Sequence, residues 1–140
     1  MILYLDTSAL VKLYIEETGS RAVSAAVART RYVATHLIAY VEMRSALARI
    51  GRMGRMTDKN LSQVKKSFEI DWNSINHILP DQAMIRRAGE HAEAFELRGY
   101  DALHLAAAES LLVASRTAVT FACYDARLNA AAQKLGMEAL

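Results

Sequence analysis

Short apolar runs alternate with longer helical stretches along this chain, and that alternation constrains its fold more than any other feature. The runs cover residues 2–5, 32–35, 75–79, 118–123 and 137–140. A short apolar run that ends at polar turn residues is typical of a buried strand. Strands that alternate with helices form a parallel sheet with helices on both faces. We therefore predict an α/β fold with three layers, α/β/α, around a short central parallel sheet of about five strands.

The segments between these runs carry apolar residues at helical spacing. They predict helices over about residues 9–17, 20–29, 36–50, 61–68, 81–97, 101–114 and 127–135. No repeat, low-complexity tract or linker interrupts them, and the only proline is Pro80, at the start of one predicted helix. We expect residues 1–140 to form a single domain.

Composition excludes several classes of protein. Hydrophobic residues make up 53% of the chain and charged residues 23%, which indicates a compact fold rather than a disordered chain. The single cysteine, Cys123, excludes an internal disulfide and a multi-cysteine zinc site, as in proteins of a reducing compartment. No apolar run reaches membrane-spanning length and the N-terminus lacks a signal-peptide pattern, so we expect a cytoplasmic protein without a membrane partner. The net charge of +2 does not by itself require a polyanionic partner.

Three acidic residues fall where strands end or where a helix begins. Asp6 directly follows the first predicted strand, Asp125 follows the fourth, and Asp101 begins a helix. In open parallel sheets, sites form beyond the carboxyl ends of the strands. Glu42 lies within the helix that leaves this edge, and no basic residue stands at helical spacing from it, so its partner must come from elsewhere. We expect these four acids to converge.

Four converging carboxylates would raise one another's pKa unless a cation neutralised them. Oxygen ligands suit Mg²⁺, which keeps several waters and leaves room for a phosphate, and Mn²⁺ should substitute for it. Such a site serves hydrolysis of a phosphodiester bond, with one metal ion or two. Taken singly, however, Asp6 can be a helix cap, Asp101 and Asp125 are better explained as helix caps or first-turn acids, and Glu42 is better explained as a solvated residue. Together, the four acids favour a shared site.

Four segments of the sequence, in order, resemble the PIN-domain nucleases, and most closely their VapC-type toxins. They are residues 5–14 (LDTSALVKLY), 41–49 (VEMRSALAR), 100–106 (YDALHLA) and 124–128 (YDARL) with the helical residues that follow. The resemblance covers nearly the whole chain and implies the PIN-like form of the fold. It makes Asp6 and Asp101 the principal metal ligands, with Glu42 and Asp125 completing the catalytic site and Ser8 shaping the first turn. Cys123 stands where many relatives have Ser or Thr.

The resemblance further implies an endoribonuclease that depends on Mg²⁺ or Mn²⁺, forms a homodimer and is inhibited by a cognate antitoxin. A basic antitoxin side chain placed among the acids would compete with metal and substrate. The alternative from another class is a catalytically silent PIN-like module that binds RNA or a partner. An aspartyl phosphatase is disfavoured because Ser8 stands where its second acid would be, and a receiver domain because its paired acids are lacking. A structure-specific DNA nuclease is disfavoured because the chain has no room for added clamp elements.

Basic residues gather around Gly51 and Gly54. They are Arg44, Arg49, Arg52, Arg55 and Lys59, and they predict an RNA path, because phosphate contacts come mainly from Arg and Lys. The alternative is a solvated helical arm. His104 lies one turn after Asp101, and we expect it to be a hydrogen-bonded structural histidine rather than a site residue.

Overall fold

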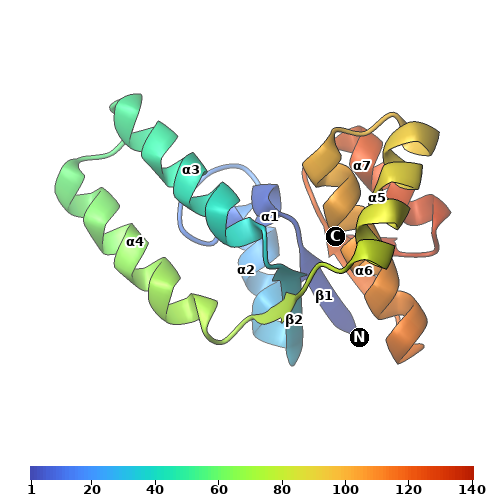
Figure 1. Ribbon diagram of the computed structural model, residues 1–140. Coiled ribbons are helices and arrows are strands. Elements are labelled where there is room, and N and C mark those ends of the chain that lie inside the picture. The colour runs from blue at the N-terminus through green and yellow to red at the C-terminus, as the bar shows by residue number, and fades with distance from the viewer.

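The computed structural model describes residues 1–140 and contains one sheet of five parallel strands (Figure 1). The strands are β1 (Ile2–Leu5), β2 (Tyr32–His36), β3 (Asn76–Ile78), β4 (Val119–Ala122) and β5 (Glu138–Ala139). Their order in the sheet is β3-β2-β1-β4-β5, and every neighbouring pair is parallel. The predicted three-layer α/β/α fold is confirmed, and β1 is its central strand.

Seven helices cover the two faces of this sheet (Figure 1). On one face lie α1 (Thr7–Val11), α2 (Ser20–Arg29), α3 (Ala39–Arg52) and α4 (Asp58–Trp72), and on the other α5 (Gln82–Phe95), α6 (Gly99–Ser115) and α7 (Ala126–Lys134). In Figure 1, α3 and α4 form an arm that projects beyond the sheet. None of these helices combines the length and apolar character that crossing a bilayer requires.

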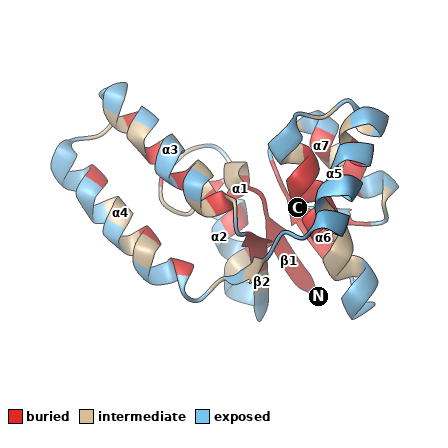
Figure 2. Cartoon of the chain, viewed as in Figure 1, coloured by how far each residue is buried: buried red, intermediate tan, exposed pale blue.

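Alternate residues of β1 serve the two cores. Leu3 and Leu5 pack with buried residues of α1 to α4, whereas Ile2 and Tyr4 pack with buried residues of β4, α6 and α7. This follows from strand geometry, since successive side chains point to opposite faces of a sheet. Figure 2 shows the buried residues on the sheet and on the helix sides that face it. Tyr4 can therefore reach α6 from the middle of the molecule.

One helical prediction was wrong in its extent. A helix was expected over residues 9–17, but α1 ends at Val11 and the chain turns back before α2. The turn buries Ile15 in the core, and Ser20 holds it by donating its hydroxyl to the Ile15 carbonyl (3.2 Å) while accepting from the Glu17 amide (3.0 Å). Apolar spacing alone could not reveal this, because Ile15 meets the core by a turn rather than by a continued helix.

The core on the α6 side should be sensitive to loss of volume at Phe121. Its ring is fully buried and stacks on that of Tyr4, with 5.5 Å between the ring centroids. We expect Phe121→Ala to lower the free energy of unfolding by about 3–5 kcal/mol, as measured by urea denaturation. Ile70→Ala is the control: Ile70 is 71% exposed, so the change should stay within about 0.5 kcal/mol. Equal losses for the two variants would contradict the assigned core.

Candidate active site

The first candidate acid and the last lie beside each other because β1 and β4 are neighbours. Leu5 pairs with Ala122 in the sheet, and the Asp6 amide donates to the Ala122 carbonyl at 3.1 Å. The strands therefore end together, and residues 6–8 run alongside residues 123–125. The Tyr124 amide donates to the Ser8 hydroxyl oxygen at 3.0 Å, which ties the two segments together.

Asp6 is a buried carboxylate, with 4% of its surface exposed. Its Oδ1 accepts from the Ser8 hydroxyl (2.6 Å) and from the Ala9 amide (2.9 Å), so it also caps α1. No protein donor contacts Oδ2. Burial raises the pKa of Asp6, and the charge of Asp101 raises it further, although these hydrogen bonds and His104 oppose the shift. Ser8 thus lies between Asp6 and Tyr124, and its role in shaping this turn stays a prediction.

Asp101 lies in the first turn of α6 and faces the same region, as its effect on the pKa of Asp6 indicates. Its Oδ2 is 3.1 Å from Nε of Arg98, an exposed residue one turn earlier. Together with Glu42, these two side chains line a hollow that also includes Gly99 and Tyr100. Asp101 and Glu42 therefore face one hollow, from helices on opposite sides of the sheet.

Glu42 has the long-range partners that its sequence neighbourhood lacks. Its Oε1 accepts from the Thr7 hydroxyl (2.8 Å) and from Nε2 of His104 (2.7 Å), while Oε2 has no protein donor. Burial alone would raise the pKa of Glu42, but the hydrogen bonds from His104 and Thr7 and the charge of His104 outweigh it and lower the pKa. Glu42 is therefore held as a carboxylate, with one oxygen engaged and one free.

Sequence reasoning missed both partners of Glu42. His104 is hydrogen-bonded, as expected of a structural histidine, but it bonds a candidate site acid as well as the core residue Tyr4. Thr7 follows Asp6 in the sequence, and no role was predicted for it. The one signal in the sequence was the missing local partner of Glu42, which required a partner distant in the chain without identifying it.

Like Asp6 at the start of α1, Asp125 caps a helix, in its case α7. Its Oδ1 accepts from the Leu128 amide at 2.8 Å, and it does not line the hollow that contains Glu42 and Asp101. Burial raises the pKa of Cys123 to about 12. The charges of Asp6, Asp125 and Asp101 raise this pKa further, whereas a hydrogen bond to the Asp125 backbone lowers it. The Cys123 thiol therefore stays protonated at neutral pH.

The free oxygens of these acids fit a hard cation that keeps much of its water. No group of three or more Asp, Glu, His or Cys side chains is arranged as a complete metal site. The charge of Asp101 nevertheless raises the pKa of Asp6, and each of these two side chains keeps one carboxylate oxygen without a protein donor. Mg²⁺ is commonly held by one or two carboxylates plus water, so this donor set is chemically suited to it.

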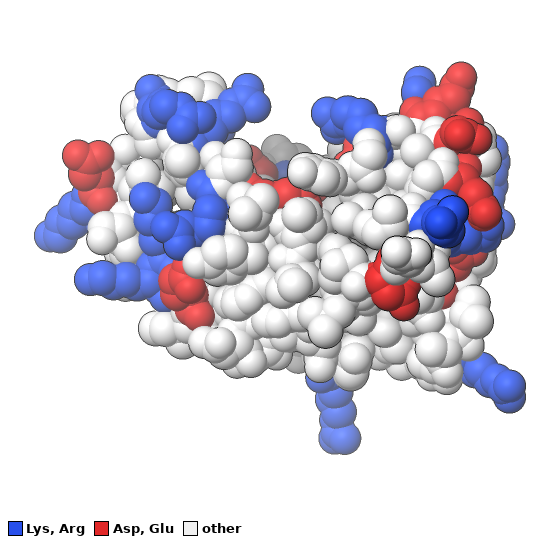
Figure 3. All heavy atoms as spheres, viewed as in Figure 1, with Lys and Arg blue, Asp and Glu red and all other residues white.

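The predicted RNA-binding arginines divide between two surfaces. Arg49 and Arg55 line a hollow with Thr7, Glu42 and Tyr100. Arg44 turns the other way: it pairs with Glu69 at 3.0 Å and lines a hollow with Lys65 and Lys66 between α3 and α4. Arg52 is exposed at the end of α3. Figure 3 shows acidic atoms deep in the notch between the arm and the rest of the molecule, with basic side chains on both rims.

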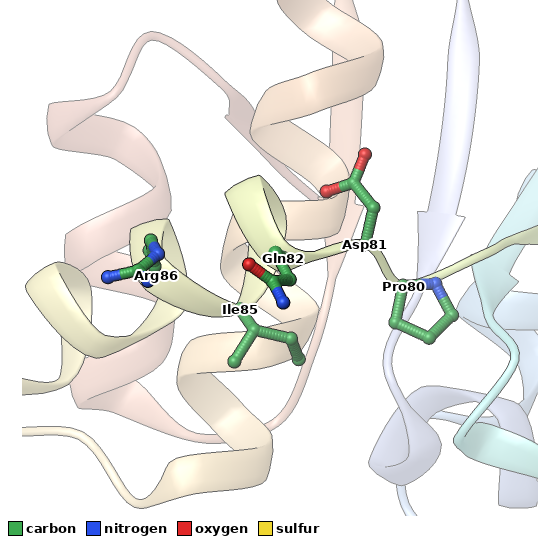
Figure 4. Close-up of a pocket in the computed structure, with 5 residues that line it drawn as sticks. All are labelled: Pro80, Asp81, Gln82, Ile85 and Arg86. Atoms are coloured by element: carbon green, nitrogen blue, oxygen red, sulfur yellow. The ribbon is translucent and has the colours of Figure 1, made fainter.

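A separate hollow lies at the start of α5 and contains none of the four candidate acids (Figure 4). It is lined by Pro80, Asp81, Gln82, Ile85 and Arg86. The Asp81 carboxylate accepts from the Met84 amide at 2.7 Å, so it serves as the N-cap of α5. Its chemistry is that of a helix start, and we assign it no catalytic part.

Acid should destabilise the fold through His36, which lies behind the site. Burial lowers its pKa from 6.5 to about 4, His104 adds to this, and Glu42 opposes it. The unfolded chain therefore binds more protons than the folded chain between these pH values, and stability falls as the pH drops through that window. Between pH 7 and pH 5 we expect a loss of about 1–2 kcal/mol from this residue, after allowance for solvent screening.

The matched variant is His36→Asn, which can still accept from the Ile38 amide, as Nδ1 of His36 does at 3.0 Å, but does not titrate. Denaturant titrations at the two pH values should show a smaller loss for this variant than for the parent. An equal loss in both proteins would show that His36 is not the group responsible.

Comparison with known proteins identifies the family of the chain. The family model of the PIN domain matches residues 3–134. Two ribonucleases of Mycobacterium tuberculosis (strain ATCC 25618 / H37Rv) are similar over 135 residues, which is 96% of this chain. VapC46 is 36% identical and matches over 93% of its own length, and VapC49 is 33% identical and matches over 92%.

Two solved structures share the fold. FitAcB from Neisseria gonorrhoeae superposes with a TM-score of 0.67 at 18% identity, over 100% of this chain and 96% of that one. VapBC2 from Rickettsia felis, solved bound to a DNA fragment from its promoter, superposes with a TM-score of 0.60 at 15% identity, over 89% of this chain and 88% of that one. The match to the family model and the identity to the two ribonucleases extend over nearly all of the sequence, and this chain therefore belongs to the PIN domain family, in its VapC-type group.

Proposed function

We propose that the chain is a metal-dependent endoribonuclease that hydrolyses RNA phosphodiester bonds. The observation that carries this proposal is the buried Asp6 carboxylate, whose pKa is raised in part by Asp101, beside a hollow that Asp101 shares with Glu42. Like charges are brought together here at an energetic cost, and a divalent cation would remove that cost. The ribonuclease names of the VapC relatives support the same activity.

Each acid has a proposed role. Asp6 and Asp101 would hold Mg²⁺, for which Mn²⁺ could substitute, through the oxygens that no protein donor contacts. Glu42 and Asp125 would complete the acidic site, and Ser8 would orient Asp6. When bound, the metal would activate a water and neutralise charge on the phosphate.

Protein nucleophiles are poorly placed to replace a water in this reaction. The Ser8 hydroxyl donates to Asp6, a proposed metal ligand, and accepts from the Tyr124 amide, so both its hydrogen and its oxygen are already engaged. The Cys123 thiol is buried and protonated because its pKa is raised to about 12. Hydrolysis by an activated water is therefore the reaction that these side chains support.

Cleavage should require both principal acids. We expect the purified chain, free of any partner, to cut RNA with Mg²⁺ or Mn²⁺, to leave DNA uncut and to stop with EDTA. Asp6→Asn and Asp101→Asn should each lower the cleavage rate by about a hundredfold or more. Loss of a residue that only hydrogen-bonds to a metal ligand already costs about 10–100-fold in activity, and loss of a ligand should cost at least as much. A gel assay with end-labelled RNA and DNA of the same sequence measures this.

Asp81→Asn is the matched control, since Asp81 caps α5 outside the site and should leave the rate unchanged. Cleavage that resists EDTA, or persists in the two site variants, would contradict the proposal. A chain that binds RNA but cleaves none with either metal would be the catalytically silent module.

The proposed RNA path follows the hollow lined by Arg49 and Arg55, with Arg52 beside them at the end of α3. Arg44 was predicted to join them, but its pairing with Glu69 turns it toward α4. RNA phosphates that approach Glu42 from the arm would pass these guanidinium groups before reaching the acids.

Salt dependence can separate the two sets of arginines. In EDTA, where no cleavage is expected, Arg49→Gln and Arg55→Gln should each reduce the slope of log affinity against log salt by about 0.7, the value for one lost phosphate contact on single strands. Arg44→Gln should leave the slope unchanged. Fluorescence anisotropy with a short single-stranded RNA gives these slopes, and an equal effect of Arg44→Gln would contradict the assigned path.

We further propose that residues 1–140 act as a single domain, in the cytoplasm, as the toxin of a toxin–antitoxin pair and as a homodimer. Exposed apolar side chains of Val41, Met53 and Tyr100 line the hollows beside the acids and would suit an antitoxin segment. The guanidinium group of Arg98 contacts the carboxylate of Asp101, a candidate metal ligand. A basic antitoxin side chain that bound the acids in the same way would inhibit cleavage.

A further inference from the structure

The buried His104 has no role in the proposed reaction, yet both of its ring nitrogens are engaged. Nδ1 lies 2.8 Å from the hydroxyl of Tyr4, and Nε2 lies 2.7 Å from Oε1 of Glu42 and 3.3 Å from the Thr7 hydroxyl. Only 1% of its surface is exposed. The residue therefore connects the core of the α6 side to an acid of α3.

The direction of these hydrogen bonds follows from the chemistry of the partners. An ionised carboxylate only accepts, so Nε2 must carry the hydrogen that Glu42 receives. When the ring is charged, Nδ1 also carries a hydrogen and both nitrogens donate. In the neutral ring, Nδ1 is an acceptor and the Tyr4 hydroxyl must donate to it. Tyr4 thus selects the tautomer that allows His104 to donate to Glu42.

Packing leaves the His104 ring little freedom. Its centroid is 5.9 Å from that of Tyr4 with an interplanar angle of 73°, and 6.4 Å from that of His36 with an angle of 79°. Two edge-on rings therefore hold it in addition to the hydrogen bonds. Since Thr7 donates to the same Oε1, Glu42 keeps a fixed orientation in which Oε2 is the free oxygen.

We propose that His104 is a positioning residue that holds Glu42 for metal binding, and that Tyr4 fixes the tautomer of His104 that does so. This inference rests on the proposed function, since it gives Glu42 a part in the metal site. Carboxylates near a metal commonly depend on such outer partners, whose loss costs about 10–100-fold in metal affinity or activity.

Three substitutions test the chain of contacts. His104→Leu removes both hydrogen bonds, His104→Gln can retain a donor to Glu42, and Tyr4→Phe removes only the hydroxyl while its ring stays stacked on Phe121. We expect His104→Leu to lower Mn²⁺ affinity, measured by calorimetry on the full chain without RNA, by about 10–100-fold. It should lower kcat with little change in the KM for RNA. His104→Gln should recover much of this loss, and Tyr4→Phe should show a smaller loss in the same direction.

His91 provides the matched control. It is also buried on the α5–α7 side, and its Nε2 also bonds a carboxylate at 2.7 Å, but that carboxylate is Glu109, which Arg87 binds as well. His91→Leu should lower the melting temperature yet leave Mn²⁺ affinity and kcat unchanged. A purely structural role for His104 predicts that His104→Leu behaves in the same way, and that result would overturn the inference.

A spectroscopic measurement on the metal-free protein keeps the inference testable if His104→Leu fails to fold. At a pH where the His104 ring is neutral, nitrogen-15 NMR of the parent should show the ring protonated at Nε2 and unprotonated at Nδ1, and Tyr4→Phe should mix the two tautomers. The opposite tautomer in the parent would overturn the inference. If the parent neither binds Mn²⁺ nor cleaves RNA, the proposed function fails. If His104→Leu and Tyr4→Phe fold and bind Mn²⁺ as tightly as the parent does, only the positioning role is refuted.

Discussion

Negative charge gathered at the carboxyl end of β1 is the constraint on which the rest of the site depends. Asp6 is buried there, and the charge of Asp101 adds to the cost of ionising it. The fold offsets part of this cost locally, because the Ser8 hydroxyl and the Ala9 amide donate to Asp6. A divalent cation would offset more of it, so the same geometry favours metal binding.

Much of this arrangement could be predicted from the sequence because it follows from topology. Parallel strands place their carboxyl ends at one edge, so Asp6 and Asp125 had to approach each other once β1 and β4 were neighbours. The extent of α1 could not be predicted, because Ile15 reaches the core by a turn that Ser20 stabilises. The orientation of Arg44 toward Glu69 was equally hidden, since it depends on how α4 packs beside α3.

His104 shows how a residue that is structural by every local criterion can still belong to a site. It lies in the buried part of α6 and bonds Tyr4, so burial alone marks it as core. Its second nitrogen reaches Glu42, which comes from the opposite side of the sheet. The site therefore joins the two halves of the molecule, and its geometry depends on the packing of β1 against α6. His91 makes a similar hydrogen bond to Glu109, but both residues lie on the α5–α7 side of the sheet.

The proposed activity requires that Asp6 and Asp101 bind one cation between them. Crystals of the chain soaked in Mn²⁺ test this most directly, through anomalous scattering from the metal. The account predicts an anomalous peak within coordination distance of carboxylate oxygens of both residues, with water completing the shell. No peak at Asp6 and Asp101 in crystals of a preparation that cleaves RNA with Mn²⁺, or a peak bound by other residues alone, would contradict it.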